Sequence, residues 1–282
     1  MNEELNETWS GLRDEIRKDI DCSLTIWSRI FEEVFEDQIE YAYAKGSSIK
    51  PWDSPIDYVP ILSDVDVHVK LNSGEELIDN SKISFDKALE ISRRYEEMFN
   101  AERPSNKHLP RMQIIYIDRL VNSPDIEYVP PRLKDVQIIY GNPKQHPLPS
   151  AERIRKIDAE RTVGQKEFIN SLHNRIWDRS GLDYWGVFRC GGIGWRVSPA
   201  PYRLVSQSHV DPLEAWGLNR TKICKELRNR EYNTIERLYS EFYETCWTIY
   251  LSDFKDNNAF REMISLGYNI LQSCLIEIEK KP

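Results

Sequence analysis

The spacing of apolar residues along the chain has two different periods. Apolar side chains that recur every three or four residues indicate amphipathic helices. This helical spacing occurs at 9–35, 85–100, 150–178, 221–229, 234–251 and 259–279. Alternating or continuous apolar runs indicate strands, and they occur at 38–45, 64–70, 111–117 and 136–140. The pattern therefore predicts a fold of the α+β class, with the largely apolar strand 111–117 at the centre of its sheet.

The order of these elements predicts two domains. A helix, two strands, a second helix and two further strands precede the proline-rich segment 142–149, which is typical of a linker. We predict an α/β domain built on a mixed sheet at 1–149 and a helical bundle domain at 150–282. Within the second domain, the segment 184–209 is rich in arginine and glycine and is predicted to be a loop or hairpin.

Two carboxylates share one face of the strand 64–70, whose sequence is DVDVHVK. Successive side chains of a strand point to opposite faces, so Asp64, Asp66 and His68 lie on one face and three valines on the other. A divalent cation is the usual partner for two neighbouring carboxylates, and Mg²⁺ prefers oxygen ligands. An edge strand with one solvated face would alternate in the same way without any metal.

A glycine and a serine follow the preceding strand 38–45 directly. Gly46 permits backbone N–H groups to approach a phosphate closely, and the hydroxyl of Ser47 can donate to it. The chain then runs through a loop with several prolines before the strand of the two carboxylates begins. A phosphate-binding turn and a metal site on neighbouring strands are what nucleoside triphosphate chemistry requires.

These residues resemble a known family. Gly46-Ser47 followed by Ser63-Asp64-Val65-Asp66-Val67 resembles the G-S…D-x-D signature of the polymerase-β-type nucleotidyltransferases, over residues 30–140. Sixteen residues separate Ser47 from Asp64, a longer interval than the family pattern has. The resemblance implies transfer of a nucleoside monophosphate from a triphosphate such as ATP to an acceptor hydroxyl, with release of pyrophosphate.

The same resemblance implies roles for individual residues. Asp64 and Asp66 would be catalytic and would bind Mg²⁺, and Gly46 and Ser47 would bind the β- and γ-phosphates. Ser63 would line the site. Strand spacing places His68 about 6–7 Å beyond Asp66 on the same face, so we expect it to line the site as a neighbour of the metal and not as a ligand. The acceptor, which could be a small molecule, an RNA or a protein, is left open.

The position of the family's third carboxylate holds a glutamine here. On the strand 111–117, Gln113 occupies the expected register, and it cannot carry the charge of a base or metal ligand. Asp118 lies five residues further on, on the opposite face and about 16 Å away along a strand. We therefore expect Gln113 to line the site without acting as a base, so that any base comes from the helical domain or the acceptor.

Two other functions fit the same motifs. The first is a nucleotidyltransferase-like protein that has lost catalysis and serves as a nucleotide-binding or protein-interaction module. The second is a metal-dependent sugar transferase that uses its D-x-D motif, but this function leaves the turn of Gly46 and Ser47 unexplained. Whether the protein is an enzyme therefore stays open at this point, with a Mg²⁺-dependent transferase favoured.

Charge and cysteine content narrow the possible partners. The net charge is −8, with −10 over 1–149 and +2 over 150–282, which disfavours general nucleic-acid binding. The near-neutral half carries Arg189 and Arg196 in the segment 184–209. This segment is either a packed connection or a flap whose two arginines bind phosphate. The five scattered cysteines, the lack of a long apolar run and the acidic N-terminus predict a cytoplasmic protein without a zinc site or membrane span.

Overall fold

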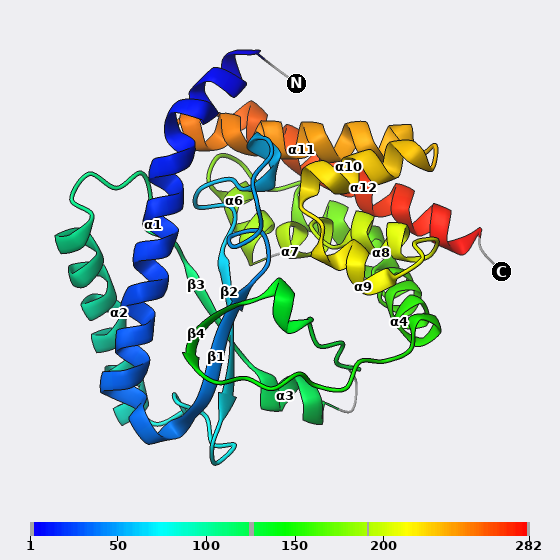
Figure 1. The fold of residues 1–282 in the computed structure, drawn as a ribbon. Coiled ribbons are helices and arrows are strands. Elements are labelled where there is room, and N and C mark those ends of the chain that lie inside the picture. Colours follow the sequence, from blue (N-terminus) through cyan, green and yellow to red (C-terminus); the bar gives the residue numbers. More distant parts are fainter. Residues whose placement is uncertain (1–2, 124–126, 191, 281–282) are drawn as a thin grey trace. The chain divides into compact units, whose positions relative to one another are not determined.

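The computed structural model describes residues 3–123, 127–190 and 192–280, and its fold is mixed α+β. The chain divides into two compact units, which are described one at a time (Figure 1). The α/β unit comprises Glu7–Lys50 and Ser63–Leu148, and the helical unit comprises Met1–Asn6, Pro51–Leu62 and Pro149–Pro282. Within the described residues, no helix is long and apolar enough to cross a membrane.

A four-stranded mixed sheet forms the middle of the α/β unit. Its strands are β1 (Ile39–Lys45), β2 (Val65–Leu71), β3 (Met112–Tyr116) and β4 (Gln137–Gly141), in the order β3-β2-β1-β4. β1 pairs antiparallel with both β2 and β4, whereas β2 and β3 are parallel. All four predicted strands are present, but the prediction that the third is central was wrong, because β4 pairs with β1 and leaves β3 at the edge.

Two long helices, α1 (Glu3–Phe35) and α2 (Lys82–Glu102), lie on the same side of this sheet (Figure 1). The three valines of β2, at positions 65, 67 and 69, are fully buried, as expected for the apolar side of the strand. α2 begins at Ser81, whose hydroxyl accepts the N–H of Ser84 and caps the helix. A short helix, α3 (Ile117–Asn122), follows β3 directly.

The helical unit contains the remaining α-helices of the described chain. They are α4 (Ala151–Val163), α5 (Lys166–Ser171), α6 (Asp183–Arg189), α7 (Ile193–Val197), α8 (Ala200–Ser206), α9 (Pro212–Gly217), α10 (Arg220–Asn229), α11 (Asn233–Leu251) and α12 (Asn257–Glu279). Short 3₁₀ helices occur in this unit at Pro55–Asp57 and Leu172–Arg175, and in the α/β unit at Glu36–Gln38 and Leu133–Asp135. The helix predicted over 150–178 is divided near Gly164 into α4 and α5.

The prediction of a loop or hairpin at 184–209 was wrong, because this segment forms most of α6 and all of α7 and α8. Two of its glycines occupy positions that require this residue. A Cβ added to Gly194 would lie 2.6 Å from the ring of Phe188, so only glycine lets the two helices approach this closely. Gly192 precedes α7 with a φ of 86°, a left-handed conformation that glycine adopts without strain.

The segment Pro51–Leu62, which the sequence places in the α/β domain, belongs to the helical unit. Asp57 accepts the backbone N–H of Thr221 at 2.9 Å and its hydroxyl at 2.8 Å. Trp247 Nε1 donates to the carbonyl oxygen of Pro55 at 2.7 Å, and buried Arg220 donates to the carbonyl oxygens of residues 56 and 57. This excursion accounts for the long interval between Ser47 and Asp64.

Candidate functional site

Gly46 and Asp66 lie against each other in the α/β unit. β1 ends at Lys45, and Gly46 then turns the chain with a φ of +90°. A Cβ added to Gly46 would lie 3.1 Å from Oδ2 of Asp66, so a larger residue would be both strained and crowded there. The glycine turn and the second carboxylate, 20 residues apart in sequence, therefore meet at one end of the sheet.

Strand register places three polar residues side by side. Lys45 of β1 pairs with Asp66 of β2, and Asp66 pairs with Gln113 of β3. Side chains of directly paired residues project from the same face of a sheet. Lys45, Asp66 and Gln113 consequently form a row across three strands, with the glutamine beside the carboxylate. Lys45 was not among the residues that sequence analysis selected, although its place at the end of β1 next to Gly46 could have indicated it.

A second cation, Arg111, approaches the site from the segment before β3. Its Nη1 lies 3.5 Å from Oδ2 of Asp64, and its Nη2 donates to Oε1 of Gln113 at 3.4 Å. Asp64 itself precedes β2, and its side chain is 29% exposed. Sequence analysis missed Arg111 as well, although it lies two residues from Gln113 and so shares its face of the strand.

Burial and the neighbouring charges shift the pKa of Asp66. Burial raises the pKa of the Asp66 carboxyl to about 6, and the neighbouring charge of Asp64 adds to this effect. The cations of Lys45 and Arg111 act in the opposite direction and lower the pKa, but they do not offset burial. The site thus combines two carboxylates with two cations, and one of its carboxyl groups ionises at a higher pH than usual.

His68 is buried and does not line an exposed site. The residue is 2% exposed, and its imidazole stacks on the ring of Tyr43 with centroids 5.4 Å apart. Burial, and then the charge of Lys45, hold its pKa well below the usual range, so His68 stays neutral. Neither ring nitrogen has a hydrogen-bond partner within the described part of the chain. His68 therefore acts as a packing residue at the centre of β2.

Asp118 lies away from the row and has partners of its own. It forms an ion pair with Lys70 and accepts the backbone N–H of Leu71 at 3.1 Å, both at the far end of β2. This position agrees with the expectation that Asp118 is too distant to replace the third carboxylate. Its carboxylate fixes the end of β2 against the start of α3.

Two side chains of α1 hold the loops that lead into the site. Arg17 donates to the carbonyl oxygens of Ser48 and Lys50, which fixes the turn after Gly46. Ser47 lies within this turn, and Ser63, which is 6% exposed, directly precedes Asp64.

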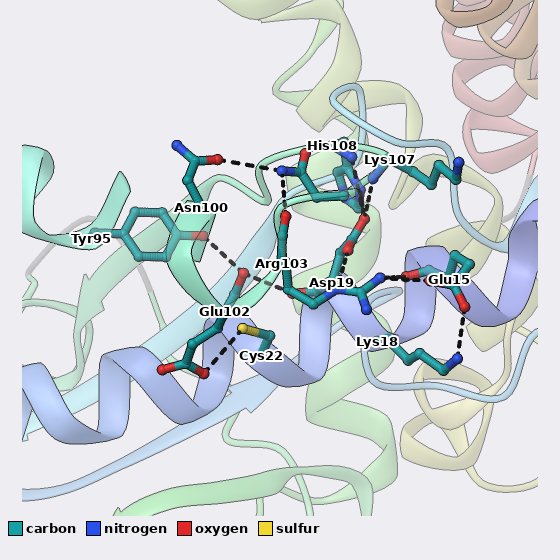
Figure 2. Close-up of polar contacts among 12 residues, drawn as sticks. Glu15, Lys18, Asp19, Cys22, Tyr95, Asn100, Glu102, Arg103, Lys107 and His108 are labelled. Atoms are coloured by element: carbon teal, nitrogen blue, oxygen red, sulfur yellow. Dashed lines mark hydrogen bonds and ion pairs between the residues drawn. The ribbon is translucent and has the colours of Figure 1, made fainter. Parts of the chain in front are cut away.

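Asp19, two residues further along α1, is completely buried and accepts the backbone N–H groups of Lys107 and His108 (Figure 2). Nε of Arg103, the residue at the C-terminus of α2, donates to Asp19 Oδ1 at 2.9 Å. These bonds fix the loop that precedes Arg111 and β3, and with it the position of Gln113.

Arg189 and Arg196 lie in the helical unit. Arg189, at the end of α6, donates to the carbonyl oxygen of Ile61 and lies over the ring of Trp185. Ile61 has a φ of 67°, which is strained for a β-branched residue, and the bond from Arg189 supports it. Arg196 lies over the rings of Trp195 and Phe168, and burial lowers its pKa. Both arginines thus have packing roles inside their own unit.

The two carboxylates of the site are donors of the kind that a hard cation takes. Asp64 and Asp66 provide carboxylate oxygens, and a triphosphate could provide further oxygen ligands to Mg²⁺. Among the residues that the structure describes, no group of three or more histidine, cysteine, aspartate or glutamate side chains could hold a metal by itself. A bound nucleotide would therefore have to complete the coordination of any metal at this site.

The chain matches no protein-family model, no curated protein and no solved structure. What the protein does is accordingly inferred from the chemistry of the row formed by Lys45, Asp66 and Gln113 and of the residues around it. The most informative of these is Gly46, because a positive φ and closeness to the carboxylate of Asp66 occur together there.

Proposed function

We propose that the α/β unit binds a nucleoside triphosphate together with Mg²⁺ and that the protein is a nucleotidyltransferase. The observation that carries the proposal is the approach of Gly46 to the carboxylate of Asp66. A phosphate bound by the backbone of the turn would lie beside a metal held by Asp64 and Asp66. Such a juxtaposition has no evident structural benefit, because it brings a carboxylate of raised pKa next to a turn that only glycine adopts without strain.

In this proposal the sheet has the arrangement of the polymerase-β-type nucleotidyltransferases, and the helical unit is a bundle that selects the acceptor. The protein would transfer a nucleoside monophosphate to an acceptor hydroxyl and release pyrophosphate. Bound Mg²⁺ would neutralise charge on the phosphates. Gly46 and Ser47 would hold the β- and γ-phosphates, and Lys45 and Arg111 supply cations on either side of the carboxylates.

One feature of the site favours a second candidate, a nucleotide-binding module without catalysis. Gln113 occupies the place beside Asp66 where a third carboxylate would deprotonate the acceptor, and Arg111 donates to its side-chain oxygen. The guanidinium of Arg111 would lower the pKa, and with it the basicity, of any carboxylate placed at position 113. Nucleotide binding is common to both candidates, and base catalysis distinguishes them.

Nucleotide binding is tested by replacing one carboxylate. Asp64→Asn is expected to abolish the rise in melting temperature that ATP with Mg²⁺ produces, because a ligand that binds only the folded state stabilises it. At 100 times the Kd this stabilisation is about 2.7 kcal/mol. Glu40→Gln, an exposed change on β1, is the matched control and should keep the full rise. Equal rises in wild type and Asp64→Asn would contradict the assignment of the metal site.

Base catalysis is tested at Gln113. Gln113→Asp is expected to start or increase Mg²⁺-dependent pyrophosphate release with a panel of hydroxyl acceptors, since a positioned base typically contributes about 10²- to 10⁴-fold. Gln113→Asn has the size of aspartate without its charge and should leave the rate unchanged. If instead Asp118→Asn removes an activity of the wild type while Gln113→Ala has no effect, Asp118 is the third acid and the proposed role of Gln113 is wrong.

A further inference from the structure

A strained turn lies where the chain passes from the helical unit back into the α/β unit. Pro60, Ile61 and Leu62 are the last residues of the excursion Pro51–Leu62, and Ser63 begins the second part of the α/β unit. The N–H of Leu62 donates to the carbonyl oxygen of Pro60 at 2.7 Å, and Ile61 between them has a φ of 67°. These features define a γ-turn of the rare type with a positive φ, which is strained.

Ile61 is an unfavourable residue for this turn. A β-branched residue with a positive φ is a conformational outlier, and such a conformation persists only where the surrounding structure enforces it. Rotation of the backbone to an extended conformation would relieve the strain, and the hydrogen bond that closes the turn would then break. Neighbouring contacts must therefore hold the turn closed.

Arg189 of α6 provides such a contact from within the helical unit. Its guanidinium donates to the carbonyl oxygen of Ile61, the residue with the strained conformation. The guanidinium carbon also lies 5.1 Å from the ring centre of Trp185, one turn earlier on the same helix, which keeps the side chain in place. The earlier part of the excursion is fixed separately, by the bonds from α10 and α11 to the 3₁₀ helix Pro55–Asp57. Arg189 thus acts directly on the strained residue.

The turn lies three residues before Asp64, one of the two carboxylates of the proposed metal site. Directly after Asp64, the N–H of Val65 donates to the carbonyl oxygen of Arg111 at 2.9 Å, which fixes the start of β2. The backbone of Asp64 therefore lies between a fixed strand and the strained turn, so rotation at Ile61 would displace it. Mg²⁺ requires oxygen ligands at about 2.0–2.1 Å in near-ideal octahedral geometry, and a small displacement of one ligand weakens its binding.

We propose that Arg189 is a positioning residue for the metal site. By holding Ile61 in its strained conformation, it fixes the backbone from which the carboxylate of Asp64 projects. This inference rests on the proposed function, because Asp64 is a metal ligand only in that proposal. The helical unit thereby influences the metal site through the backbone that connects the two units.

Hydrogen exchange of the full-length protein without ligand tests whether Arg189 holds the turn. Arg189→Met keeps a long side chain over the ring of Trp185 but removes the donor. Exchange of the peptide 60–66 should then be roughly tenfold faster, the value of one hydrogen bond from a charged group. In an Ile61→Gly background the same change should have an effect of less than about twofold, because glycine adopts a positive φ without strain. Equal effects of Arg189→Met in both backgrounds would overturn the proposal.

The Mg²⁺ requirement tests whether the turn positions Asp64. The Mg²⁺ concentration that gives half of the rise in melting temperature with ATP should increase roughly tenfold in Arg189→Met, as the hydrogen bond is lost. Arg189→Lys keeps a charged donor and should return this concentration close to the wild-type value. The double variant Ile61→Gly with Arg189→Met should match Ile61→Gly alone, a rescue that a general loss of packing around α6 would not produce.

Arg261→Met is the matched control. Arg261 is exposed and lies over the ring of Tyr184, which belongs to the same helix α6 as Arg189. Its replacement removes one guanidinium from a ring of this helix and should leave both the exchange of the peptide 60–66 and the Mg²⁺ requirement unchanged. Changes as large in Arg261→Met as in Arg189→Met would overturn the specific role of Arg189.

Failure of this proposal can be distinguished from failure of the proposed function. If ATP with Mg²⁺ does not stabilise the wild type at all, the proposed function is wrong, and Asp64 has no metal for which it must be positioned. If the wild type is stabilised and Arg189→Met has the same Mg²⁺ requirement, the nucleotide site is retained and the positioning role of Arg189 is overturned.

Discussion

Asp19→Asn is expected to lower the free energy of unfolding by about 3 to 5 kcal/mol, the usual cost of removing one partner from a buried ion pair. Asp19 is fully buried and joins α1 to the end of α2 and to the loop before β3 (Figure 2). Asparagine would leave Arg103 with only its partly exposed partner, Glu15. The single side-chain oxygen of the asparagine could still accept the backbone N–H groups of Lys107 and His108 in place of Oδ2, but its NH₂ group would then stand where Oδ1 accepts from Arg103, so two donors would face each other.

The effect of this substitution should depend on pH. Burial alone would raise the pKa of Asp19, but the hydrogen bonds from His108, the backbone of Lys107 and Arg103 outweigh it and lower the pKa. A carboxyl group with a lowered pKa in the folded state contributes stability above its unfolded pKa. This contribution disappears as pH falls through the folded value. The difference between wild type and Asp19→Asn should therefore be constant near neutral pH and shrink below a pH of about 4.

Urea unfolding followed by circular dichroism, repeated from pH 3 to pH 8, measures this difference. Glu15→Gln is the matched control, since Glu15 pairs with the same Arg103 but is partly exposed. Exposed ion pairs contribute at most about 1 kcal/mol, so this variant should stay close to the wild type. A loss as small for Asp19→Asn as for Glu15→Gln would show that the buried carboxylate does not stabilise the fold.

Asp66→Asn is expected to have the opposite effect and to raise the free energy of unfolding by roughly 3 kcal/mol at pH 8 without metal. Burial raises the pKa of Asp66 from 3.8 to about 6, so the folded protein prefers this group in its neutral form. A pKa that differs by one between the folded and unfolded states corresponds to about 1.4 kcal/mol. Asparagine resembles the neutral carboxyl group and avoids the cost of the buried charge. The row with Lys45 and Gln113 would then be more stable but unable to bind a metal.

The sign of the pH dependence distinguishes Asp66 from Asp19. A raised pKa in the folded state means that the folded protein binds more protons between pH 4 and pH 6. The unfavourable contribution of Asp66 is therefore complete above about pH 6 and disappears below about pH 4. The difference between wild type and Asp66→Asn should follow this course in EDTA. The variant should also lose the stabilisation by ATP with Mg²⁺.

The same urea titration serves for Asp66, with Glu40→Gln as the control for removing one charge from a strand of the sheet. Glu40 is exposed, so its replacement should change stability by less than about 0.5 kcal/mol at any pH. If Asp66→Asn destabilises the protein at pH 8, the charged carboxylate is stabilised by Lys45 and Arg111 more than burial destabilises it. The raised pKa would then be wrong.

The sequence by itself determined the type of the four strands and of the longer helices, and the alternation of side chains within the strands. A helical or alternating period is a local property, and burial of one face enforces it. For this reason the strands at Ile39–Lys45 and Val65–Leu71 and the helices α10 to α12 begin within two residues of the positions predicted from the sequence. The segment 184–209 was an exception, because its glycines resemble loop residues and only the contact of Gly194 with Phe188 shows that this glycine permits helix packing. The short helices α3 and α9 were not predicted either.

The tertiary structure decided which residues meet. The alternation of side chains along β3 places Gln113 on one face of the strand, but only the pairing of β3 with β2 places it beside Asp66. The pairing of whole strands also decided three other features. They are the edge position of β3, the approach of Gly46 to Asp66, and the position of Arg111 between Asp64 and Gln113. Except for the local contact of Arg111 with Gln113, these contacts join segments 20 or more residues apart, and they depend on strand order and register. Both follow from how whole elements pack together, which no local period encodes.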